Sequence, residues 1–150
     1  MPNWMSGRMR IRGSTENLLN FFRNGINMYG MDDKFESVLK PREGWYSEKR
    51  IGDYIECNGS NGAYVEGTKR AFLEDFSADI YLVDDSQCVE VDVYQAWSFD
   101  SEDWRGISEK YKIDIWLRGE EPDNAFSQTI KIVGGEIKID RCEDLDDWED

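Results

Sequence analysis

The chain has 150 residues, of which 39% are hydrophobic and 13% aromatic, so it can bury a core as a single domain. Its 32 acidic and 18 basic residues give a net charge of −14 at pH 7, which argues against direct binding to nucleic acid or to a membrane. No apolar run approaches the roughly 20 residues that cross a bilayer, and the first residues carry no export signal, so the sequence predicts a cytoplasmic protein.

The acidic charge is unevenly distributed along the chain. Residues 1–50 carry a net charge of +3, residues 51–100 carry −9 and residues 101–150 carry −8. Such a field favours a basic protein partner. The same charge also keeps many acidic domains in solution, so this second interpretation stays open.

The first elements in the chain are a strand and a helix. Residues 8–12 alternate between arginine and apolar side chains, which is typical of a half-buried strand. Ser14 or Thr15 can cap a helix that ends at Gly25, with Leu18 and Phe22 on its apolar face. Residues 26–62 are harder to interpret: a short helix at 34–39 and a strand at 54–57 before a turn are both conceivable.

The second half of the chain has clearer patterns. Residues 79–83 and 88–94 predict a hairpin around a turn at 84–86. Asp100 or Ser101 can cap a helix over 101–111, followed by a strand at 112–117 and a hairpin at 129–139 around Gly134-Gly135. We therefore predict an α+β fold of the ferredoxin-like kind, a mainly antiparallel sheet with two helices on one face. It would form one domain over residues 1–142, followed by an acidic tail at 143–150. The expected core includes Ile11, Leu18, Phe22, Val91, Val93, Trp104, Ile107, Ile115 and Ile132.

Four short motifs occur in a distinctive order. They are Met1-Pro2-Asn3-Trp4, Gly67-Thr68-Lys69, Tyr94-Gln95-Ala96-Trp97-Ser98, and Glu120-Glu121-Pro122 followed by Phe126-Ser127. This order resembles the phage- and plasmid-borne YubB-like ferredoxin-like domain family. The resemblance implies the same fold and an origin on a mobile element, and it implies no reaction. The chain departs from the family pattern at Met5, where members usually have Cys, and at Glu66 and Arg70, where they have Trp, so a family site at these positions would be altered.

Residues suited to catalysis are scarce. The chain has no histidine, which removes the commonest general base and zinc ligand, and its three cysteines are widely spaced. Asp84-Asp85 and Glu120-Glu121 could ligate Mg²⁺ or Ca²⁺, but an acidic pair in a turn is ordinarily only solvated. Glu120-Glu121-Pro122 fits a structural role better, such as capping backbone N–H groups. We therefore predict no enzymatic activity, no metal and no cofactor.

Residues suited to protein binding are more frequent. Exposed aromatic side chains rimmed by acids are typical of binding surfaces. The predicted partner-binding residues are Asp84, Asp85, Glu143, Asp144, Asp146, Asp147, Trp45, Tyr46 and Trp148. Arg8, Arg10 and Arg12 share one face of their strand, where they could touch phosphate, although pairing with the acidic tail is the preferred interpretation.

These features favour a binding protein, either monomeric or a small homo-oligomer. The leading hypothesis is a phage-encoded, non-enzymatic inhibitor of a bacterial defence nuclease, such as a CRISPR effector or a restriction enzyme. It would act in the host cytoplasm by placing carboxylates where phosphates belong, or by occlusion, on the basic surface of the nuclease. The alternatives are an accessory protein that binds another phage or host protein, and a small metal-dependent hydrolase.

Overall fold

The computed structural model describes residues 3–31, 37–39, 46–59, 62–74, 77–83 and 85–145. These residues form two helices and twelve strands. The helices are α1 (Thr15–Asn24) and α2 (Ser101–Tyr111). The strands are β1 (Trp4–Gly13), β2 (Ile26–Met31), β3 (Ser37–Leu39), β4 (Tyr46–Ile51), β5 (Tyr54–Gly59), β6 (Ala63–Val65), β7 (Ala71–Leu73), β8 (Ser77–Tyr81), β9 (Gln87–Ala96), β10 (Asp114–Glu121), β11 (Phe126–Val133) and β12 (Glu136–Asp144).

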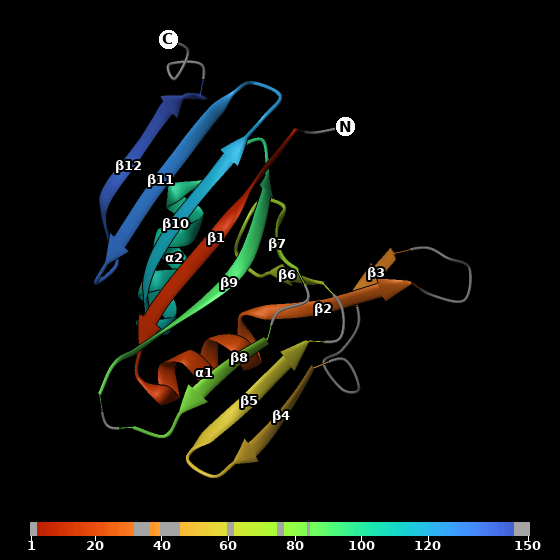
Figure 1. Ribbon diagram of the computed structural model, residues 1–150, viewed down its shortest axis with the longest axis vertical. Coiled ribbons are helices and arrows are strands. Elements are labelled where there is room, and N and C mark those ends of the chain that lie inside the picture. Colours follow the sequence, from red (N-terminus) through yellow and green to blue (C-terminus); the bar gives the residue numbers. More distant parts are fainter. Residues whose placement is uncertain are drawn as a thin grey trace.

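The strands form two sheets in which every pairing is antiparallel. The large sheet has nine strands in the order β12-β11-β10-β1-β9-β7-β6-β2-β3, and the small sheet has three in the order β4-β5-β8. Figure 1 shows the long strands β9 to β12 and β1 side by side, with the small sheet at the opposite end of the molecule from the last residues of β12.

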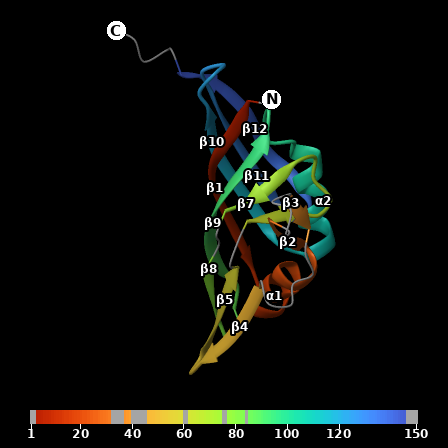
Figure 2. The ribbon, with the colours of Figure 1, turned by 90° about the vertical axis from the view of Figure 1, so that its right-hand side faces the viewer.

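Both helices have the caps that their sequences predict. The Ser14 side chain accepts a hydrogen bond from the backbone N–H of Asn17, and Gly25 closes α1. The Asp100 carboxylate accepts from the N–H groups of the first turn of α2. α1 packs against β1, β2 and β8, and α2 packs against β10, β11 and β12 (Figure 2). Between the two helices, Phe21 meets Tyr111 edge to face.

One continuous core lies between these elements. Along β1, Met5, Met9 and Ile11 are buried, while the alternate arginines are exposed. The nine predicted core residues are all buried: Ile11, Leu18, Phe22, Val91, Val93, Trp104, Ile107, Ile115 and Ile132. The predicted hairpin at 129–139 is also confirmed, with positive φ angles of 61° at Gly134 and 77° at Gly135 in its turn.

The ferredoxin-like α+β prediction is wrong, because the described chain is mostly β. The strands predicted at 8–12, 88–94, 112–117 and 129–139 do share one sheet. Residues 26–81, however, contribute seven further strands, β2 to β8, which extend the large sheet and build the small one. All seven of these strands have only three to six residues, too few for a clear period-2 pattern.

Two local predictions also need correction. The predicted hairpin of 79–83 with 88–94 does not form: β8 pairs with β5, while β9 pairs with β1 along its whole length and with β7 at Val93–Gln95. The short helix considered at 34–39 is excluded over Ser37–Leu39, which is strand β3 and pairs with β2. Residues 34–36 lie outside the described residues.

Candidate functional site

The small sheet presents a face that combines two tyrosines with two carboxylates. A turn with Gly52 in a left-handed conformation, φ 61°, joins β4 to β5, and β8 pairs with the other edge of β5. On one side of this sheet Cys57, Ala78 and Ile80 are buried in the core. Because successive side chains of a strand point to opposite sides of the sheet, the side chains between these residues point toward solvent.

The outward side of β5 and β8 carries Tyr54, Glu56, Asp79 and Tyr81, here called the tyrosine–carboxylate face. Tyr54 lies opposite Tyr81 with ring centroids 5.4 Å apart, and Glu56 lies opposite Asp79 in the next row. Like charges directly opposite each other destabilise a sheet. Lys49 of β4, opposite Glu56 on its other side, offsets part of that repulsion.

The pKa of the Tyr54 phenol reflects the partial desolvation and the negative charge of this face. Partial desolvation, followed by the negative charges of Asp79 and Glu56, raises the pKa of Tyr54 above its ordinary value. The tyrosine therefore stays neutral at physiological pH and can donate a hydrogen bond among carboxylates that accept. This arrangement suits an arginine or lysine from a partner, which can pair with the carboxylates and stack on the rings.

The end of β8 is held rigidly while its side chains stay exposed. Gln87 bonds both backbone groups of Tyr81, accepting from its N–H at 2.7 Å and donating to its carbonyl at 2.8 Å. The side chains of Tyr81, Leu82 and Val83 are 46%, 37% and 48% exposed. Exposed apolar residues therefore follow the tyrosine–carboxylate face directly in the sequence, before Asp85, which is also exposed.

Tyr46 does not form the exposed aromatic anchor that the sequence predicts. Its hydroxyl donates to Glu48 at 2.8 Å, and Glu48 in turn binds the Arg23 guanidinium of α1 at 2.6 Å. The ring packs against the core, and burial raises its pKa. Tyr46 therefore ties β4 to the body of the protein.

The other predicted binding residues have different locations. Glu143 and Asp144 belong to strand β12, opposite Ser127 and Phe126, and Glu143 pairs with Arg141 at 3.2 Å. Strand β12 thus continues past residue 142, where the sequence predicted a tail. Asp84, Asp146, Asp147, Trp45 and Trp148 lie outside the described residues.

The three arginines of β1 pair with carboxylates on neighbouring strands. Arg8 binds Asp92 at 2.7 Å, Arg10 binds Glu90 at 2.8 Å, and Arg12 binds Asp114 at 2.6 Å. Charge pairing was the preferred interpretation of this stripe, but the observed partners lie on β9 and β10 and not in the predicted tail.

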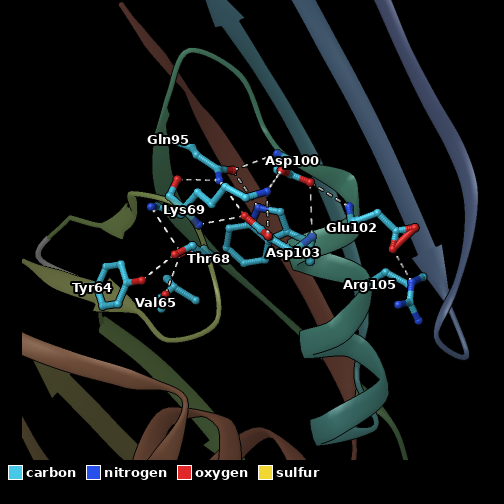
Figure 3. A network of polar contacts seen from close by, with 11 residues as sticks. Tyr64, Val65, Thr68, Lys69, Gln95, Asp100, Glu102, Asp103 and Arg105 are labelled. Carbon is cyan, nitrogen blue, oxygen red and sulfur yellow. Dashed lines mark hydrogen bonds and ion pairs between the residues drawn. The ribbon is translucent and has the colours of Figure 1, made fainter. Parts of the chain in front are cut away.

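Three of the family-like motifs converge at one end of α2. Figure 3 shows Gln95 between Lys69 and the first turn of α2: its amide N–H donates to the Lys69 carbonyl at 2.9 Å, and its oxygen accepts from Asp100 N–H at 3.1 Å. Lys69 binds the Asp100 carboxylate at 2.5 Å, which lowers the pKa of Asp100. The backbone N–H of Trp97 donates to the Asn3 carbonyl at 2.7 Å. The network uses its polar groups to join segments, so we assign it a structural role.

The fourth motif is also structural. Glu121 is fully buried, and its Oε2 accepts the backbone N–H of Asn124 at 2.5 Å in the turn before β11. This confirms the predicted capping role of Glu120-Glu121-Pro122. Within the described part of the chain, Glu121 Oε1 has no hydrogen-bond partner.

The sequence did not identify the tyrosine–carboxylate face. It indicated a strand at 54–57, but only the pairing of β5 with β8 brings Glu56 to Asp79 and Tyr54 to Tyr81. Among the described residues, no group of three or more His, Cys, Asp or Glu side chains is placed to hold a metal. Neither α1 nor α2 is long and apolar enough to span a bilayer.

Comparison of the chain with protein-family models, with curated proteins and with solved structures gives no match. The resemblance to the YubB-like family therefore stays a prediction from its four motifs.

Proposed function

We propose that this chain is a phage-encoded, non-enzymatic inhibitor of a bacterial defence nuclease, of the anti-CRISPR or anti-restriction kind. It acts in the host cytoplasm by presenting carboxylates to the basic surface on which the nuclease binds nucleic acid. The observation that carries the proposal is the tyrosine–carboxylate face, where Glu56 and Asp79 stand opposite each other beside two tyrosines.

The pairing of the basic residues supports the same function. Within the described ranges, eight of them form ion pairs: Arg8, Arg10, Arg12, Arg23, Lys69, Arg105, Lys138 and Arg141. With 32 acids and 18 bases in the chain, carboxylates remain in excess for a partner beyond those paired with the chain's own cations. Asp53 adds to this excess in the turn that leads into β5.

A cleavage assay tests the proposal. Purified protein is added to a panel of CRISPR effectors and restriction nucleases, and cleavage of labelled DNA is measured at rising salt. We expect inhibition of at least one enzyme, weakening as salt screens the ionic contacts. A Glu56→Gln/Asp79→Asn double variant should inhibit more weakly. The control Glu136→Gln/Asp140→Asn makes the same charge change on β12 and should inhibit like the parent.

One observation favours a second candidate, an accessory protein that binds another phage or host protein through an apolar contact. Trp97 is 56% exposed and adopts a left-handed backbone conformation with φ 71°, which is costly for a bulky residue. Exposed tryptophans are frequent anchors of protein interfaces. If Trp97→Ala abolishes partner capture and the Glu56→Gln/Asp79→Asn variant does not, the second candidate replaces the first.

A further inference from the structure

The large sheet has an open face, formed by the side chains of β1, β9, β10 and β11 that point away from α2. Its most exposed aromatic residue is Trp116, at 40%. Arg10 and Lys131 are the register partners of Trp116 on β1 and β11. Their cationic groups lie 5.5 and 5.4 Å from the centroid of the indole ring, so the three residues form one cation–aromatic row across the sheet.

Two hollows border this row. The small hollow has a volume of about 230 Å³ and is lined by Arg8, Arg10, Glu90, Trp116 and Arg118. The large hollow has a volume of about 350 Å³; its walls include Arg12, Lys131 and the apolar Val133, and it shares Arg10 and Trp116 with the small one. The two hollows therefore lie next to each other, an arginine-rich one beside a larger, partly apolar one.

The charge of this site is opposite to that of the chain. Five cations, Arg8, Arg10, Arg12, Arg118 and Lys131, meet three carboxylates, Glu90, Asp92 and Asp114. The carboxylates hold the β1 arginines at fixed positions. Arg118 instead donates to the Thr129 hydroxyl at 3.2 Å, and within the described residues no carboxylate pairs with it or with Lys131. The site carries a local +2 in a chain of −14, so the net charge alone does not predict what this face binds.

From this geometry we propose that the two hollows bind a nucleotide, with its phosphate against Arg8, Arg10 and Arg118 and its base against Trp116. Guanidinium groups pair with phosphate oxygens through two parallel hydrogen bonds. An exposed indole stacks on a nucleobase without regard to sequence. A free nucleotide and one nucleotide of a single-stranded nucleic acid share this chemistry. The site lies on a different sheet from the tyrosine–carboxylate face, so the inference is independent of the proposed inhibition.

Calorimetric titration of the full chain with separate ligands tests the site. AMP should bind saturably and more tightly than adenosine or inorganic phosphate, because only AMP fills both hollows. Arg118→Gln should weaken AMP binding about tenfold, as should Trp116→Ala, in line with the usual strengths of charge-assisted hydrogen bonds and of base stacking. The matched control is Arg141→Gln, which removes the same charge from strand β12 outside both hollows and should bind like the parent.

The same titration with an eight-residue oligothymidylate distinguishes the two sources of the ligand. Tighter binding of the oligonucleotide than of AMP identifies a single strand, and equal or weaker binding identifies a free nucleotide. The proposal is overturned if neither ligand binds saturably at millimolar concentration, if phosphate binds as tightly as AMP, or if Arg118→Gln and Arg141→Gln have the same effect. No nuclease is present in these titrations, so their failure contradicts the nucleotide site alone.

Discussion

Glu56 of β5 and Asp79 of β8 lie directly opposite each other, although two carboxylates in such a position repel each other. Lys49 of β4 lies opposite Glu56 on the other edge of β5. Asp79 lies opposite Glu56 alone, so within this sheet no basic residue lies opposite Asp79. This carboxylate pair lowers the stability of the free protein and lies at the surface. A basic partner that binds there would relieve the repulsion, as expected of a binding site.

Asp79→Asn should therefore stabilise the protein while weakening its inhibition of a target. The substitution removes the cross-strand repulsion and keeps the Lys49–Glu56 pairing, so we expect a gain of roughly 0.2–1 kcal/mol in the free energy of unfolding. Glu56→Gln loses both the repulsion and the attraction of Lys49, and should change stability less. Urea unfolding of the three proteins measures the difference, and a loss of stability in Asp79→Asn contradicts the prediction.

Gln95→Ala should strongly destabilise the protein. Gln95 is 1% exposed, and its side-chain oxygen accepts from both Asp100 N–H and the Trp104 indole N–H, so truncation leaves the buried indole donor and the partly buried Asp100 N–H without this partner. The expected cost is roughly 1–3 kcal/mol, which for a chain of this size lowers the melting temperature by several degrees. Gln87→Ala removes an amide that water can replace and should cost less. Thermal unfolding followed by circular dichroism compares the two.

Local sequence patterns predicted single elements of this fold but not its architecture. The caps Ser14 and Asp100, the Gly134-Gly135 turn and the nine core residues could be recognised because each depends on a few neighbouring residues. The pairing of β8 with β5 could not, since it brings together residues about 25 positions apart and β8 has only five residues. A strand of that length alternates equally well against several partners, so the register depends on the whole sheet.

The candidate sites, too, could be predicted only as far as they depend on neighbouring residues and not on strand pairing. Arg8, Arg10 and Arg12 were recognisable as one stripe from their spacing, but their partners on β9 and β10 follow from tertiary pairing. Trp116 was recognisable as a strand residue, and only the register with Arg10 and Lys131 turns it into the centre of a site. The aromatic at position 46 fitted a binding surface by composition, yet the Arg23–Glu48 pair holds it against the core.

The stability of the protein should fall in alkaline solution because of Cys57. This thiol is fully buried, and burial raises its pKa from 9.0 to about 11. Below pH 9 the thiol is protonated in both the folded and the unfolded chain, so its contribution to stability is fully present. Between pH 9 and 11 only the unfolded chain loses the proton, and stability falls by an amount on the order of 2–3 kcal/mol.

Urea unfolding at pH 8 and at pH 10.5 measures this loss. Cys57→Ala should lower stability at pH 8 through lost packing, but its stability should depend less on pH. Some pH dependence should remain, because burial also raises the pKa of Tyr46. Cys88→Ala, at an exposed position, should keep the pH dependence of the parent. An equal dependence in Cys57→Ala and the parent contradicts the assignment to Cys57.

The last prediction separates the C-terminal acids from the tyrosine–carboxylate face. Asp144 ends β12, and the backbone N–H of Leu145 donates to the Ala125 carbonyl at 2.8 Å, so a chain cut after Leu145 keeps the whole strand. Removing residues 146–150 takes away four acids and changes the net charge from −14 to −10. Charges outside a contact surface steer association, whereas charges inside it determine how slowly the complex dissociates.

If the tyrosine–carboxylate face makes the contact, the truncated chain should associate with its target more slowly at low salt, with an unchanged dissociation rate. The Glu56→Gln/Asp79→Asn variant should dissociate faster. Surface plasmon resonance at two salt concentrations resolves both rates. If the truncated chain no longer binds while the double variant binds like the parent, the C-terminal acids make the contact and the face does not.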